Sequence, residues 1–336
     1  MIKYLGSKRK LTGAILEAVG TLEGARSVLD LFSGTSRVGH ALKRAGYRVI
    51  ANDHNAYAHA LARCYVEADQ ERVLEDAARL VAELNRLPGT AGWFTETFCS
   101  GARFFHPKNG ARVDAIRDAI AEKGLDPVLE SVLLVALMEA ADRVDSTCGV
   151  QMAYLKKWAP RALSDLELRV PDVLPRARHG AGEAHRKDAA LAAESLSADV
   201  AYLDPPYNQH SYLSNYHVWE SLVLWDRPEV YGVANKRVDC RERKSPFNSK
   251  QRFLEAFTAV LDRLDARLIV VSFSDEGFVG RDAMEALLSR YGEVTVMAHD
   301  YKRYVGAQIG IYNPKGERVG EVSHLYNTEF LYLVRR

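Results

Sequence analysis

The sequence predicts an α/β protein with an open, mostly parallel sheet and a helical segment inserted between two parts of that sheet. Apolar segments at 27–31 and 47–52 are separated by a glycine-containing loop and a helical stretch, the pattern of a strand–helix–strand unit. Long helical patterns then replace this alternation, and strands and helices alternate again from Gly182. We therefore expect one domain made of 1–62 and 180–336, and an inserted helical domain at 63–179.

Composition sets the broad class of the protein. The chain has 336 residues, of which 47% are hydrophobic and 26% charged, with a formal net charge of +1, as in globular proteins. It has no run of about 18 apolar residues and no signal-peptide profile, so we expect a cytoplasmic protein that does not enter membranes. The four cysteines are scattered without metal-site spacing, and no metal is expected.

The first candidate site is a glycine turn near the N-terminus. Gly6 and Ser7 precede a helical pattern whose apolar stripe runs from Leu11 to Leu22, with Ser7 as the expected N-cap. A turn leading into a helix presents free N–H groups that favour an anion such as a carboxylate. Taken alone, these residues favour the alternative, an ordinary solvated basic segment.

The loop after the first strand is the second candidate. It contains Asp30, Phe32, Gly34 and Thr35 but lacks the spacing of a dinucleotide fingerprint and the Lys-Ser/Thr ending of a phosphate loop. Asp30 would repel a pyrophosphate and attract a cationic ligand, which indicates S-adenosylmethionine. The next strand ends in Asp53, where a carboxylate can accept hydrogen bonds from both ribose hydroxyls. The alternative is an ordinary strand–helix turn.

The third candidate is the stretch Asp204-Pro205-Pro206-Tyr207, which follows the apolar segment 200–203. Proline has no N–H for a strand ladder, so a strand must end there and place Asp204 at the carboxyl edge of the sheet. An acid, a rigid carbonyl and an aromatic face suit a flat ring that bears an amino group. The same residues are also typical of an ordinary turn. Upstream, Asp188 is expected either beside a nucleoside base or as a helix N-cap.

The remaining segments complete the expected fold. Helices are expected at 71–87, 112–121 and 128–142, strands at 268–273, 294–297 and 329–334, and a hairpin at 301–310 with a turn at 313–316. A basic, aromatic loop at 103–112 and a basic stretch at 236–252 are expected either to contact phosphates or to be plain surface loops.

Taken in order, these pieces resemble the Dam-like adenine-N6-specific DNA methyltransferases. The likeness covers most of the chain, and the order of its parts, with the cofactor loop first, an insertion next and the Asp-Pro-Pro-Tyr motif late, is similar to the α arrangement of that family. One departure is visible, because the family loop usually reads Phe-x-Gly-x-Gly and this chain has Ser36 at the last position.

The resemblance implies a Rossmann-like S-adenosylmethionine-dependent sheet whose helical insertion contributes to target recognition. It also implies methyl transfer to the N6 amino group of an adenine flipped out of duplex DNA, in a restriction–modification or host-methylation system. The expected partner is double-stranded DNA, and a cognate restriction endonuclease is a possible second partner whose presence does not follow from the sequence. The alternatives are methylation of an RNA base, or a non-catalytic DNA-binding subunit that kept the fold.

The resemblance further implies two sets of site residues. The catalytic set is Asp204, Pro205, Pro206 and Tyr207. The cofactor-binding set is Tyr4, Gly6, Ser7, Lys8, Asp30, Phe32, Gly34, Thr35, Asp53 and Asp188. The recognition sequence, the oligomeric state, and the residues of 63–179 and 208–252 that touch bases do not follow from the sequence.

Overall fold

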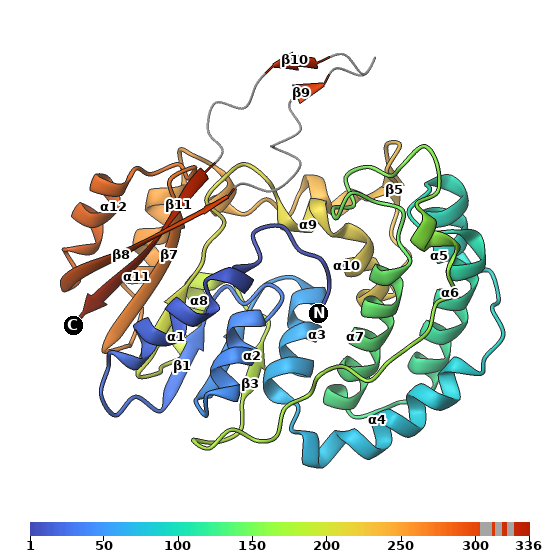
Figure 1. Ribbon diagram of the computed structural model, residues 1–336, viewed down its shortest axis with the longest axis horizontal. Coiled ribbons are helices and arrows are strands. Elements are labelled where there is room, and N and C mark those ends of the chain that lie inside the picture. The colour runs from blue at the N-terminus through green and yellow to red at the C-terminus, as the bar shows by residue number, and fades with distance from the viewer. Residues whose placement is uncertain (303–310, 313–317, 321–325) are drawn as a thin grey trace.

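The computed structural model describes residues 1–302, 311–312, 318–320 and 326–336. Seven strands form one sheet, and the predicted α/β architecture is confirmed (Figure 1). β11 is antiparallel to both of its neighbours, and the five strands from β3 to β7 are parallel. In spatial order the strands are β3 (Glu183–His185), β2 (Arg48–Asn52), β1 (Ser27–Asp30), β4 (Val200–Leu203), β7 (Leu268–Ser274), β11 (Tyr326–Arg335) and β8 (Glu293–Lys302).

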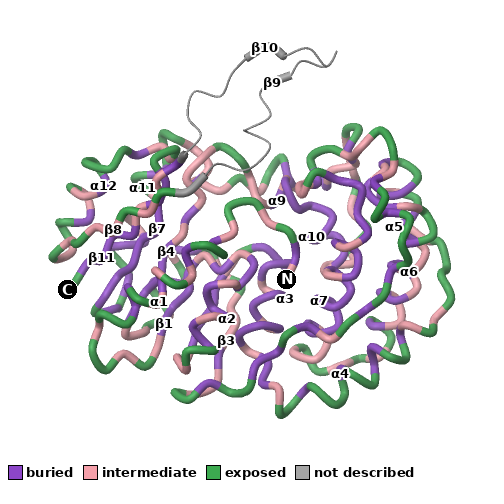
Figure 2. The backbone as a smooth tube through the Cα atoms, in the orientation of Figure 1, coloured by how far each residue is buried: buried purple, intermediate pink, exposed green. Residues whose placement is uncertain are grey.

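Helices cover both faces of the sheet, so its central strands are buried on both sides (Figure 2). Successive strand residues point to opposite faces; in β7, Val270 packs into one core and Val271 into the other. The first core includes α1 (Thr12–Gly20) and α2 (Arg37–Arg44). The second includes α8 (Ala189–Ser195), α11 (Phe253–Leu261) and α12 (Arg281–Leu288).

A third core joins the helices on the right of Figure 1. The expected helices at 71–87, 112–121 and 128–142 are present as α4, α6 and α7, and α6 starts five residues before its expected position. Helix α10 comes from outside the 63–179 segment and packs into the same core. The helices of this core are α3 (Ala56–Ala62), α4 (Gln70–Asn85), α5 (Trp93–Thr95), α6 (Pro107–Glu122), α7 (Pro127–Arg143) and α10 (His217–Leu224).

Two expectations about local structure are wrong. Phe104 and Phe105 are fully buried in the helical core, so much of the expected aromatic loop at 103–112 is core and helix. Its aromatic rings are too apolar to stay in solvent when a core lies beside them. Ser7 gives no capping hydrogen bond, and a short 3₁₀ turn at Lys8–Lys10 separates it from α1.

The C-terminal part agrees with the expected strands where it is described. β8 and β11 extend beyond the expected 294–297 and 329–334. Most of the expected hairpin at 301–310 and the whole turn at 313–316 lie outside the described residues. Across the described ranges, every helix is too short or too polar to cross a bilayer.

Candidate active site

The candidate site is a cavity of about 500 Å³ at the carboxyl ends of β1, β2 and β4. β1 lies between β2 and β4, and the chain order reverses at this place, where open α/β sheets bind ligands. All ten residues of the expected cofactor-binding set line the cavity. Asp204 and Pro206 line it as well, whereas Pro205 and Tyr207 are neighbours of these residues in the chain and are not among its lining residues.

The three acids that were expected to bind the cofactor have different environments. Asp30, 1% exposed, accepts a hydrogen bond from the Gly39 N–H at 3.1 Å. Burial is the main cause that raises the pKa of Asp30 to about 7, and the nearby Asp204 charge adds to it. Asp53 accepts from the N–H groups of Gly34 (3.1 Å) and Asn55 (2.9 Å), which holds its carboxylate at the end of β2.

Asp188 combines the two functions that its sequence position left open. Its carboxylate accepts from the Ala190 N–H at 2.9 Å and caps α8, and the residue also lines the cavity. A capped helix N-terminus holds the carboxylate in a fixed position.

Lys8, in the cavity wall, forms ion pairs with two carboxylates. Its Nζ lies 3.1 Å from Asp204 Oδ1 and also donates a hydrogen bond to Glu329 on β11. Glu329 is fully buried and additionally accepts from the Ser272 hydroxyl at 3.0 Å. Burial lowers the pKa of Lys8, but the charges of Asp204 and Glu329 outweigh it and raise that pKa well above its usual value. Lys8 therefore stays charged and neutralises part of this acidic pair.

Asp204 keeps an exposed side, because 21% of its side chain is accessible. Burial raises its pKa to about 6 against the lowering effect of Lys8, and Glu329 raises it further. The neighbouring Tyr207 packs edge-on against Phe273 with ring centroids 5.4 Å apart, and its carbonyl accepts from the Phe278 N–H at 3.1 Å. The strand end thus presents a fixed acid beside a fixed aromatic ring.

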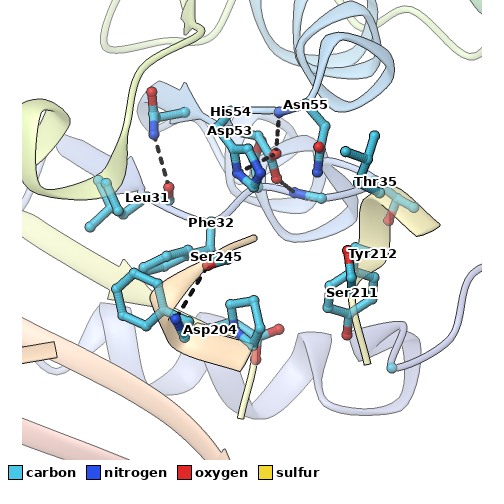
Figure 3. Close-up of a pocket in the computed structure, with 18 of the residues that line it drawn as sticks. Leu31, Phe32, Thr35, Asp53, His54, Asn55, Asp204, Ser211, Tyr212 and Ser245 are labelled. Carbon is cyan, nitrogen blue, oxygen red and sulfur yellow. Dashed lines mark hydrogen bonds and ion pairs between the residues drawn. The ribbon is translucent and has the colours of Figure 1, made fainter. Parts of the chain in front are cut away.

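The N-terminal turn reaches the cavity through an aromatic stack. Tyr4 is stacked between Tyr212 and Tyr216, with ring centroids 5.1 and 4.5 Å away. Gly6 has φ +74°, and a Cβ there would come within 3.0 Å of the Tyr212 hydroxyl, so a larger residue is disfavoured. Figure 3 shows Tyr212 and Thr35 facing Phe32 and Ser245 across the cavity.

The departure at Ser36 has a structural explanation. Ser36 has φ +56°, in the left-handed region that glycine adopts without strain. A non-glycine residue there costs about 1–2 kcal/mol, which accounts for glycine in the usual family pattern. Ser36 still makes the turn, because its N–H donates to the Ser33 carbonyl and its own carbonyl accepts from His40.

Sequence reasoning missed several parts of the site. Residues 242–248 form one wall of the cavity, whereas the 236–252 stretch was expected to contact phosphates or to be a plain surface loop. Within that stretch, Arg237 is 3% exposed and pairs with Asp226 and Asp239, so it is not available to phosphates. Glu329 also escaped notice, because a lone acid in an apolar strand gives no sign of its partner. Only Tyr212 had a signal, since it follows the Asp-Pro-Pro-Tyr stretch in a segment too aromatic for a plain linker.

The cavity suits an adenosine that carries a positively charged amino-acid chain. Ser33 Oγ and Asn55 Oδ1 are buried polar atoms without hydrogen-bond partners in the described part of the chain, and both residues line the cavity. Buried polar atoms of this kind are costly unless a ligand or water satisfies them. The under-bonded acid Asp30 supplies the negative charge that a cationic ligand requires.

Comparisons with known proteins agree with this geometry. A sequence model described as D12 class N6 adenine-specific DNA methyltransferase matches residues 4–287. The Type II methyltransferase M.NlaIII of Neisseria lactamica is 29% identical over 99% of this chain and 98% of its own length. M.CviAII of Paramecium bursaria Chlorella virus 1, also a Type II methyltransferase, is 30% identical over 90% of this chain and 92% of its own.

A further relative is similar in one part only. The Type II methyltransferase M.FokI of Planomicrobium okeanokoites is 30% identical over 87% of this chain but 47% of its own length. The family match runs from the N-terminal turn through the Asp204 strand end, so it includes the predicted catalytic and cofactor-binding sets. The expected resemblance is confirmed, and the chain belongs to the D12 class of N6 adenine-specific DNA methyltransferases.

Proposed function

We propose that the chain transfers a methyl group from S-adenosylmethionine to the N6 amino group of an adenine flipped out of duplex DNA. The observation that carries this proposal is that Asp204 opens on the same cavity as Asp30 and Asp53. Three of the relatives are Type II methyltransferases, which supports a place in a restriction–modification system with a cognate endonuclease.

In this proposal the cofactor binds along the ends of β1 and β2. S-adenosylmethionine supplies a methyl group on a sulfonium. Asp30 binds its ammonium group, Asp53 binds the ribose hydroxyls, and Asp188 lies beside the adenine. Phe32, Gly34 and Thr35 line the pocket, and the turn containing Tyr4, Gly6 and Ser7 faces the methionine end. The Lys8 ammonium already pairs with the carboxylates of Asp204 and Glu329. We therefore propose that Lys8 positions the Asp204 carboxylate and compensates its charge.

The adenine amino group is a poor nucleophile, because its lone pair is delocalised into the ring. The catalytic step therefore requires that this lone pair be localised on the nitrogen. Asp204 and the Pro205 carbonyl accept hydrogen bonds from the two amino hydrogens and localise that lone pair. The amino nitrogen bonds the methyl group as its bond to the sulfonium breaks, and the methylated nitrogen then releases one proton to solvent. Pro206 stiffens the turn, and Tyr207 stacks on the base with about 1–3 kcal/mol of stabilisation. This offsets part of the few kcal/mol that base flipping costs. Alignment of the reacting atoms supplies roughly 7–11 kcal/mol of the remaining acceleration.

The helical segment 63–179 is proposed to recognise the DNA target. Cations on it that face solvent include Lys156 and Lys157, near Arg103, whose guanidinium lies 4.5 Å from the Trp158 ring centroid. In the 236–252 stretch, the exposed cations that remain suited to phosphates are Arg241, Lys244, Lys250 and Arg252. Cations of this kind bind DNA through counterion release, without sequence specificity of their own.

The direct experiment incubates the protein with labelled S-adenosylmethionine and DNA of varied sequence, with RNA as the control. Label at the N6 of adenine in duplex DNA supports the proposal, and sequencing the product identifies the recognition site. Label in RNA alone would support the RNA-methylating alternative, and DNA binding without transfer would support the non-catalytic subunit. Protection of the methylated DNA from an endonuclease of the same specificity tests the restriction–modification role.

A further inference from the structure

The loop that follows Tyr207 is held by few contacts of its own. Asn208, Gln209 and His210 form a short connection to α9 (Tyr212–Asn215). Inside it, the His210 N–H donates to the Asn208 side-chain oxygen at 3.0 Å. Because Tyr207 is immediately before this connection, the position of its ring depends on where the loop is fixed.

One side chain from a segment 40 residues away fixes that loop. The side-chain amide of Asn248 donates to the backbone carbonyls of Asn208 (2.8 Å) and His210 (3.1 Å). An asparagine amide has two N–H donors, so both are used on this loop. Asn248 itself closes a 3₁₀ turn at Pro246–Asn248.

The same turn forms part of the cavity wall. Phe247, 5% exposed, packs edge-on against Phe32 with ring centroids 5.1 Å apart. Its N–H donates to the Ser245 hydroxyl at 3.3 Å, the bond drawn near Ser245 in Figure 3. Phe32 and Phe247 both line the cavity in which the cofactor is proposed to bind. A ligand that settles against these rings therefore fixes the turn that carries Asn248.

Resting on the proposed function, we infer that Asn248 is a positioning residue that sets the place of Tyr207. Asn248 holds the loop 208–210, which follows the Tyr207 ring. Through Asn248, the position of this loop depends on whether the cofactor occupies the cavity. Cofactor and target DNA then bind with positive coupling. Couplings between two sites typically change affinity about 5- to 150-fold, and each ligand affects the other equally.

The experiment measures DNA affinity by fluorescence anisotropy, with and without S-adenosylhomocysteine. The DNA is an unmethylated duplex that contains the recognition sequence of the protein. The variants are Asn248→Ala, which removes both donors, and Asn248→Asp, which keeps the shape and replaces the amide by oxygen. In the wild type, S-adenosylhomocysteine should tighten DNA binding. In both variants that tightening should fall at least about threefold, and kcat should fall about tenfold to a hundredfold, as for misplaced reacting groups. The KM for S-adenosylmethionine should change little.

The chain contains a matched control in Asn109. Its side-chain amide also donates to two carbonyls two residues apart, those of Ala162 (3.1 Å) and Ser164 (2.9 Å), but it lies in the helical core and does not line the cavity. Asn109→Ala should lower the melting temperature and leave coupling and kcat unchanged.

The outcomes separate this inference from the proposed function. Wild-type coupling and kcat in a folded Asn248 variant would overturn the inference, as would an equal loss of coupling in Asn109→Ala. A wild-type protein that transfers no methyl group to DNA would instead overturn the proposed function.

Discussion

Asp114 in the helical half and Asp30 at the sheet edge are both almost fully buried, at 2% and 1% exposed. Asp114 accepts hydrogen bonds from the N–H groups of Gly92, Phe94 and Thr95 and from the Thr95 hydroxyl. Asp30 accepts from Gly39 alone among the described groups, and burial raises its pKa to about 7. The first carboxylate is satisfied by the fold, whereas the second is left ready for a cation.

The same difference holds for other polar residues. In the helical half, Asn109 donates to two carbonyls, and its side-chain oxygen accepts from the Leu166 N–H at 3.1 Å. At the cavity, buried oxygens of Ser33 and Asn55 have no partner in the described part of the chain. For these residues, the fold satisfies the buried polar groups of the helical half, whereas those at the cavity are left for a ligand, and the predictions test the two sides of this contrast.

The largest effect is expected at the sheet edge for Asp204→Ala. Loss of one of the two proposed acceptors should lower the methyl-transfer rate about a hundredfold to a thousandfold, by analogy with the removal of one transition-state hydrogen bond. DNA binding should persist, because phosphate contacts provide most of it. Single-turnover transfer and a parallel DNA-binding titration measure the two effects. Full activity in this variant would contradict the mechanism.

A stability effect is expected in the helical half for Asp114→Ala. Removing the carboxylate leaves several buried N–H groups unsatisfied, at about 1–3 kcal/mol for each buried group. The free energy of unfolding should fall by about 3 kcal/mol or more, as denaturant titration would show. Transfer per folded molecule should be unchanged at low temperature, and a selective loss of kcat would place Asp114 with the cavity residues instead.

Asp30→Asn should lower cofactor affinity and raise the stability of the free protein at alkaline pH. Loss of a hydrogen bond to a charged group should weaken S-adenosylhomocysteine binding about tenfold to a hundredfold, as calorimetry would measure. The folded carboxyl has a pKa of about 7 against an ordinary 3.8, so the folded state holds a proton that the unfolded state has released. Wild-type stability therefore falls as pH rises through this window.

Asparagine does not ionise, so the Asp30→Asn variant does not lose this part of its free energy of unfolding as the pH rises. The stabilising effect of Asp30→Asn should be full above pH 7 and vanish below about pH 4. Melting temperatures measured across this range provide the check, and a variant that is less stable than wild type at pH 8 would show that the Asp30 carboxylate is structural like Asp114.

The smallest effect is expected on the pH profile of kcat, measured at saturating cofactor so that Asp30 is already paired. Transfer should fall as Asp204 gains a proton near pH 6. Lys8 lowers the pKa of Asp204 and Glu329 raises it, so Lys8→Gln should move the acidic limb to higher pH and Glu329→Gln to lower pH. Shifts in the same direction for both variants would rule out this electrostatic account.

Local patterns predicted the sheet better than they predicted the cavity walls. The strand ends at Asp30, Asp53 and Asp204 could be predicted because each acid comes at the end of a largely apolar segment, and parallel strands bring such ends together. Helices α4 and α7 could be predicted from the spacing of their apolar residues. For α4, the Pro-Gly pair after Leu87 also indicated where the helix ends.

The remaining features depend on contacts that sequence spacing does not contain. Glu329 and Lys8 are 321 positions apart, and no local signal indicates that they meet. A count of basic residues at 236–252 could not distinguish the paired Arg237 from the exposed Lys250. The wall at 242–248 was hidden for the same reason, because its polar residues look like those of any surface loop.

Ser36 also bears on how this loop changes during evolution. Glycine at a left-handed position relieves about 1–2 kcal/mol of backbone strain, but it adds about 0.5–1 kcal/mol of entropy to the unfolded chain. The second term offsets about half of the first, so serine costs about 0.5–1 kcal/mol more than glycine at this position. A penalty of this size is small beside the stability of a folded domain, so a serine in the last place of the motif is compatible with membership of the family.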